Sequence, residues 1–187
     1  MAVLTLRRAA AIVAVLLALA AGPCRAQAPP APTEYQLKAV FLFNFSQFVD
    51  WPAAAFADDN SPLVIGVLGR DPFGAMLDEI VRGETVNGRP LAVRRYESIA
   101  QLDACHILFI DRSQAEQFDA ILTALKGRSI LTVGDFDGFA RGGGIIRFVT
   151  VGNKIRLKVN LVAAQQAKLT ISSKLLRPAQ IVEPGQD

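Results

Sequence analysis

Residues 63–72 read LVIGVLGRDP and decide the fold. The first six are apolar or glycine without interruption, which is typical of a strand covered on both faces in a parallel sheet. Asp71 and Pro72 follow closely, and an aspartate cap with proline in the first turn is a common start for a helix. We therefore expect a strand at residues 63–68 and a helix to about residue 81, as in a βαβ unit.

The same alternation of short apolar runs and helix-starting residues continues to residue 133. Strands are expected at residues 90–96, 106–110 and 130–133, and Ser113 with Glu116 forms a capping box for a helix that ends near residue 125. The pattern predicts a single α/β domain, in which helices cover both faces of a doubly wound, mainly parallel sheet.

An antiparallel hairpin is expected to finish this sheet. Residues 154–160, KIRLKVN, alternate strictly between polar and apolar side chains, as in a strand with one face on the core. Gly152 and Asn153 predict a two-residue turn that joins this strand to another at residues 145–151. Beyond the hairpin, Asn160 is expected to cap a helix through residue 167, and Ser172 or Ser173 to cap a last short helix.

The first helix of the mature chain is expected to begin at the capping box of Thr33 and Gln36 and to end near residue 50, before Trp51 and Pro52. Its side chains are apolar nearly all round. Such a helix is either buried in the core or buried against a partner, and the sequence leaves both interpretations open.

Residues 1–28 have the pattern of a cleavable signal peptide, with two arginines, an apolar run at residues 9–21 and small residues at 26 and 28. The alternative is a lipid anchor on Cys24, although Pro23 stands where a lipoprotein signal requires a small residue other than proline. We expect export, with a linker at residues 29–33, an α/β domain at residues 34–182 and a flexible tail at residues 183–187.

Cleavage of this leader changes the charge balance. It removes Arg7, Arg8 and Arg25 from the 20 basic residues, which leaves 17 to match the 17 acidic ones. The mature chain is then close to neutral, so nucleic acid is not an expected partner. Cys105 becomes the only cysteine, which excludes an internal disulfide, and a buried, unreactive thiol is the favoured interpretation.

Six segments in order resemble the YfiR family: residues 35–52, 66–74, 105–106, 131–140, 142–148 and 154–176. The resemblance implies a periplasmic α/β protein without enzymatic activity. It also implies a homodimer that binds and represses the periplasmic sensor domain of an inner-membrane diguanylate cyclase, and so lowers cyclic-di-GMP signalling and biofilm formation. One departure is the cysteine content, because family members often carry several cysteines.

Four residues outline a candidate ligand crevice at the carboxyl ends of the expected strands: Gly69, Arg70, Asp111 and Asp135. The crevice supports the alternative function of a small-molecule binding module that feeds a transporter or receptor. Acids at strand ends, including Asp71, could also bind a cation or accept phosphate. However, Asp71 is better explained as a helix cap, and we expect no metal and no cofactor.

No catalytic constellation is expected. Cys105 and His106 are neighbours in sequence, but adjacent side chains of a strand point to opposite faces and cannot form a nucleophile and base pair. A hydrolase remains a third hypothesis, and it requires activity that responds to substitution of His106 or Asp135.

Residues 142–176 contain no acidic side chain and supply two candidate partner-binding surfaces. One comprises Arg156, Lys158 and Asn160, and the other comprises Lys174, Leu175 and Leu176. The alternatives are that the charges only keep a sheet edge soluble and that the leucine pair belongs to the core.

Overall fold

The computed structural model describes residues 32–152 and 154–183. The expected signal peptide and most of the expected linker lie outside the described residues, as do residues 184–187 of the expected tail. Within the described part of the chain, no helix is both long enough and apolar enough to span a bilayer.

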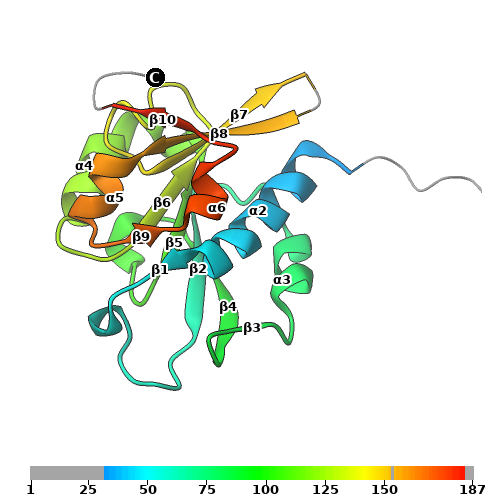
Figure 1. The fold of residues 1–187 in the computed structure, drawn as a ribbon, viewed down its shortest axis with the longest axis vertical. Helices are drawn as coiled ribbons and strands as arrows, with labels where there is room; N and C mark the ends of the chain where they lie inside the picture. The colour runs from blue at the N-terminus through cyan, green and yellow to red at the C-terminus, as the bar shows by residue number, and fades with distance from the viewer. Residues whose placement is uncertain (1–31, 153, 184–187) are drawn as a thin grey trace, which may run out of the picture. The chain divides into compact units, whose positions relative to one another are not determined.

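The described residues form an eight-stranded sheet in the order β10-β8-β7-β6-β5-β2-β4-β3 (Figure 1). Its strands are β2 (Leu63–Leu68), β3 (Thr85–Val86), β4 (Arg89–Tyr96), β5 (Ile107–Ile110), β6 (Leu131–Gly134), β7 (Ile146–Val151), β8 (Lys154–Asn160) and β10 (Gln180–Val182). A separate antiparallel pair joins β1 (Val49–Asp50) to β9 (Thr170–Ile171).

The sheet is parallel from β4 through β2, β5 and β6 to β7. The β3–β4 and β7–β8 pairs are antiparallel, and β10 returns parallel to β8. The expected fold class is therefore confirmed, including the C-terminal antiparallel hairpin. The short strands β1, β3, β9 and β10 were not predicted.

Helices lie on both faces of the sheet. They are α2 (Glu34–Phe48), α3 (Ala75–Val81), α4 (Phe118–Ala124), α5 (Leu161–Gln166) and α6 (Ser173–Leu176). One hydrophobic cluster joins the sheet to α2, α3 and α6, and the other joins its opposite face to α4. Both faces of the central strands are thus covered, which explains the unbroken apolar runs in the sequence.

Helix α2 is a core helix. It begins at the predicted capping box, where Thr33 and Gln36 each bond the backbone of the other. Leu42 and Phe45 are fully buried, and the Phe45 ring stacks on that of Phe148 with centroids 5.8 Å apart. The helix ends two residues earlier than expected, because Val49 takes an extended conformation and pairs with β9.

Two helix starts differ from the prediction. Helix α3 begins at Ala75 and not after Pro72, since Asp71 Oδ1 accepts bonds from the backbone N–H groups of Phe73 and Gly74, and Gly74 has a φ of 55°. The second difference is at the predicted capping box of Ser113 and Glu116. There Asp111, and not Ser113, is the cap, because its side chain accepts a hydrogen bond from the N–H of Ser113. A 3-10 helix, Arg112–Gln117, precedes α4 there.

Phe139 explains why glycines stand on both sides of it in the sequence. A Cβ atom added to Gly134 or to Gly144 would collide with the Phe139 ring. The ring is completely buried and also packs against Phe118 and Phe136. The residues after β6 therefore form a tightly packed aromatic turn.

Candidate functional site

The candidate crevice lies where the chain order of the sheet reverses. Strand β2 has β4 on one side and β5 on the other, and such a switch point is the usual ligand site of an open α/β sheet. Gly69 and Arg70 follow β2, and Asp111 follows β5. These predicted residues do come together in the structure.

Protein groups bridge this switch point. The Arg70 N–H lies 3.3 Å from Ser113 Oγ, and a Cβ on Gly69 would come within 2.7 Å of the same oxygen. Asp111 is buried and accepts from the Ser113 N–H at 2.9 Å. The loops that follow β2 and β5 therefore pack directly on each other.

Asp135, the fourth crevice residue, is bound by side chains of α2. Its Oδ2 atom accepts from Lys38 Nζ at 2.6 Å and from the Tyr35 hydroxyl at 3.0 Å. The side chains of Lys38 and Asp135 are each only 3% exposed. Burial first, and then the Asp135 charge, raise the pKa of Tyr35 to about 12, so its hydroxyl stays protonated as a donor.

The same lysine has a second acidic partner at the surface. Lys38 Nζ lies 2.5 Å from Glu34 Oε1, and this contact is the main cause that lowers the pKa of Glu34. Asp135 Oδ1 is buried without a hydrogen-bond partner among the described residues. The cluster joins the start of α2 to the end of β6, and nothing in it resembles an activated nucleophile.

His106 is also committed to backbone partners. The Val64 N–H donates to its Nδ1 at 3.0 Å, which requires that Nε2 carries the proton and donates to the Ala55 carbonyl at 3.1 Å. The ring stacks on Phe56 with centroids 4.3 Å apart. Burial, the largest cause, lowers the pKa of His106 below its usual value.

Cys105 points to the opposite face of the sheet, where it packs against Gly66 and Tyr96. Burial raises the pKa of its thiol to about 12. The side chains of Cys105 and His106 are therefore separated, as predicted, although both residues precede β5 and do not belong to it. Within residues 32–152 and 154–183, no group of three or more His, Cys, Asp or Glu side chains could hold a metal ion.

The first candidate partner surface lies on the β7–β8 hairpin. Lys158 pairs with Arg147, Arg156 with Val149 and Lys154 with Val151, so these six side chains share the outer face of β7 and β8. We call this set of six residues the hairpin face. Asn160 does not belong to it: it is 2% exposed, caps α5 and donates to the Ala140 carbonyl.

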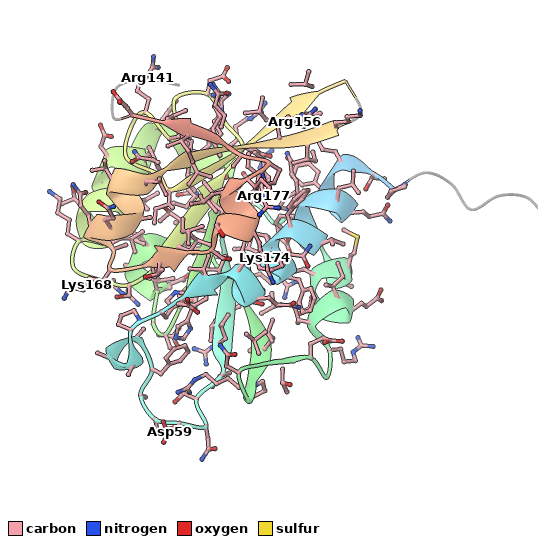
Figure 2. The ribbon with its side chains drawn as sticks, in the orientation of Figure 1. Asp59, Arg141, Arg156, Lys168, Lys174 and Arg177 are labelled. Atoms are coloured by element: carbon pink, nitrogen blue, oxygen red, sulfur yellow. The ribbon has the colours of Figure 1, made fainter. Side chains whose placement is uncertain are left out.

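The second candidate surface is divided between core and solvent. Leu175 is 6% exposed and Leu176 packs against the same hydrophobic cluster, whereas Lys174 is exposed on α6. Figure 2 shows Arg156 on the hairpin and Lys174 near α6, while Lys168 lies well away from them. The acid-free stretch of sequence is thus not one continuous patch.

Two hollows were not anticipated from the sequence. One, of about 400 Å³, is lined by Val149, Val151, Arg156, Leu157, Lys158, Pro178 and Gln180. We call it the hairpin trough. The alternation of residues 147–151 could have indicated two outward-facing valines, but Pro178 and Gln180 reach the trough only through tertiary packing.

The other hollow, of about 390 Å³, lies between α4 and α5. Its apolar lining includes Leu122, Ile130 and Ile145, and its charged lining includes Lys126 and Asp119. None of the predicted crevice residues lines it. A ligand at this position would therefore occupy a different part of the fold from the switch point.

Comparison with known proteins gives one family. Residues 35–180 match the family described as YfiR/HmsC-like, and this range contains all the helices named above apart from the first residue of α2. No curated protein matches the chain. Because the match extends over most of the sequence, the chain belongs to the YfiR/HmsC-like family.

Proposed function

We propose that this protein is a periplasmic regulator without enzymatic activity. It binds the periplasmic sensor domain of an inner-membrane diguanylate cyclase and represses it, which lowers cyclic-di-GMP signalling. The observation that carries the proposal is the family match over residues 35–180. Export rests on the signal-peptide pattern of residues 1–28, and the periplasmic location rests on the family match.

The buried polar groups support a binding role. Lys38, Asp135 and His106 are held by protein partners, and Cys105 has a raised pKa that keeps it protonated. Groups in these states are poorly suited to act as nucleophile, base or acid on a substrate. The exposed cations Arg156 and Lys174 are in contrast available to contact another protein.

We assign partner contact to the hairpin face and to Lys174. Exposed charges mainly increase the rate of encounter, while apolar side chains that become buried supply most of the affinity. Val149 and Val151 are therefore the proposed apolar contacts within the hairpin face, with Arg156 and Lys158 beside them.

Deletion of the gene tests the proposal. In cells that express the partner cyclase, we expect cyclic-di-GMP and biofilm to rise, and expression of the intact gene to restore both. A strain that lacks the cyclase as well is the control, because deletion should have no effect there. Unchanged cyclic-di-GMP in the presence of an active cyclase would contradict the proposal.

A second candidate function is a periplasmic small-molecule binding module. The hollow between α4 and α5 favours it, because a lining that combines apolar side chains with Lys126 and Asp119 fits a small amphipathic ligand. A thermal-shift screen of periplasmic metabolites checks this candidate. A hit that is lost in Ala163→Leu, which adds bulk at a residue of α5 that lines the hollow, would support this candidate; binding that survives the change would exclude the site.

We also propose that the working form is a homodimer. Light scattering on the purified protein at micromolar concentration measures its mass directly. A mass of twice the mature chain is expected, and a monomer across the whole concentration range would contradict this part of the proposal.

A further inference from the structure

The outer edge of β8 is only half covered. Strand β7 pairs with β8 along its whole length, from Val151 opposite Lys154 to Ile146 opposite Val159. On the other side, β10 pairs only with residues Lys158, Val159 and Asn160. Within the described residues no strand covers the outer side of residues 154–157, and Figure 1 shows the hairpin projecting beyond β10.

The backbone at this open edge can accept another strand. The Asn160 N–H donates to the Ile145 carbonyl at 2.8 Å, which shows that Asn160 directs its backbone towards the β7 side. In an antiparallel pair this direction alternates along the strand, so Lys154, Arg156 and Lys158 also face β7. Ile155 therefore directs its N–H and C=O groups outward, away from β7.

The side chains beside the open edge form a matching surface. The hairpin trough runs over Val149, Val151 and Arg156 and is bounded by Pro178 and Gln180. Val151 is 60% exposed, so it presents an apolar side chain to this trough. A strand laid along β8 would place alternate side chains over this trough.

The charges around the open edge of β8 indicate which kind of segment can pair with it. Lys154, Arg156, Lys174 and Arg177 are all exposed, and residues 142–176 contain no acidic side chain. The nearby acid Asp137 is already paired with Arg147. A second copy of the same edge would bring like charges together, which disfavours self-pairing, whereas an acidic segment would be attracted.

We propose that residues 154–157 of β8 receive an extended, acidic segment of the partner protein as an additional strand, in line with β10. The segment carries apolar side chains at alternate positions that enter the hairpin trough. This inference rests on the proposed function and specifies its mode of contact: backbone hydrogen bonds provide the affinity, and the cations and the trough provide the selectivity.

A proline variant at position 155 distinguishes strand addition, which needs backbone hydrogen bonds, from simple charge attraction. Ile155→Pro removes the outward N–H but no hydrogen bond to β7, and proline is tolerated where an edge-strand N–H faces outward. Ile155→Ala is the matched control, since it loses the same half-buried side chain and keeps the N–H. Both variants are compared with the intact protein in the deletion strain, with periplasmic levels measured by immunoblot.

We expect Ile155→Ala to restore repression and Ile155→Pro to leave cyclic-di-GMP at the level of the deletion strain. Equal repression by the two variants would overturn the inference. The proposed function would still stand in that case, provided that deletion alone raises cyclic-di-GMP. Absence of any deletion effect would instead remove the proposed function.

Two charge-reversal variants test whether the cations beside β8 select the segment. Arg156→Glu should weaken repression, whereas Lys168→Glu, a charge reversal at an exposed position far from the hairpin, should not. Equal effects of the two substitutions would assign the contact to overall charge and overturn the strand model.

A peptide measurement does not depend on the folding of any variant. The probe is a capped ten-residue peptide that alternates glutamate and valine, and the control peptide has the same composition with the two residue types in separate blocks. The alternating peptide should slow hydrogen exchange at the Ile155 amide by about tenfold or more, because that N–H gains a bond. Equal protection by both peptides, or self-association of the protein through this edge in their absence, would overturn the inference.

Discussion

Lys38 Nζ lies 2.6 Å from Asp135 Oδ2, although the two residues are 97 positions apart in the chain. Both side chains are buried, and the contact joins α2 to the end of β6. Because a buried charge is costly without its partner, this pair makes the position of α2 depend on the loop that follows β6.

Removal of one partner of this pair should strongly destabilise the fold. We expect Lys38→Met to reduce the free energy of unfolding by about 3–5 kcal/mol, since Asp135 would remain as an uncompensated buried charge. The double variant Lys38→Met with Asp135→Asn should recover part of this loss. Glu34→Gln, which changes the exposed partner of Lys38, should cost less than about 1 kcal/mol. Urea unfolding measures all three, and a similar cost for Glu34→Gln and Lys38→Met would contradict this interpretation.

Stability should fall in mild acid because of His106. Its pKa in the folded protein is lowered, chiefly by burial, while Arg89 also lowers it and the Ala55 carbonyl raises it. The unfolded chain therefore binds the proton more readily. The free energy of unfolding should be constant above the unfolded pKa of about 6.5 and decrease at lower pH, by no more than about 1.4 kcal/mol per pH unit.

His106→Asn is the control for this pH dependence, since an amide oxygen can accept from the Val64 N–H and does not titrate. The variant should be less stable at neutral pH but should lack the decrease below about pH 6.5. The same slope in both proteins between pH 5 and 6.5 would assign the effect to other groups.

Gly134→Ala should destabilise the protein through a collision with the Phe139 ring. The expected cost is about 1–3 kcal/mol, as for other overpacked cores. Phe139→Leu removes the ring, so the added methyl group should cost much less in that background. Additive effects of the two substitutions would show that the ring does not limit residue 134.

Cys105 should be unreactive in the folded protein. Its thiol is buried, with a pKa of about 12, and donates to the Ile107 carbonyl. Modification by a thiol reagent at pH 8 should be slower than in urea by at least about a hundredfold, because the thiolate population and the access are both low. Rapid modification without loss of structure would contradict the buried position.

Leu175 should contribute to the stability of the fold, whereas Lys174 should contribute to repression. Leu175→Ala should reduce the free energy of unfolding by about 2–4 kcal/mol, as expected for a buried leucine. Lys174→Glu should leave the thermal midpoint unchanged and weaken repression. Equal midpoints for Leu175→Ala and the intact protein would mean that Leu175 does not belong to the core.

Local patterns were sufficient for most of the fold. The caps at Thr33 and Asn160 and the β7–β8 hairpin depend on neighbouring residues, and they occur where the sequence predicts them. The predicted start of α3 was wrong, because Asp71 caps a tight bend whose last residue, Gly74, takes a positive φ. Neither aspartate nor proline alone distinguishes such a bend from a helix start.

The candidate site was less predictable. Arg156 and Lys158 lie on the outer face as the alternation implies, but burial of the polar Asn160 depends on the distant Ala140 carbonyl. The partnership of Lys38 with Asp135 likewise requires the three-dimensional fold. Sequence periodicity indicates which way a side chain points within its own element, and it does not identify the group that the side chain meets.

The pairing of β1 with β9 has a consequence for biogenesis. Helix α2 meets Phe73 early in the chain, but Val49 lies opposite Ile171 and α2 also packs on Phe148, so part of its packing waits for the last third of the polypeptide. Such distant contacts close slowly. A chain that crosses a membrane with its N-terminus first could therefore not complete the packing of α2 until nearly all of it has been synthesised.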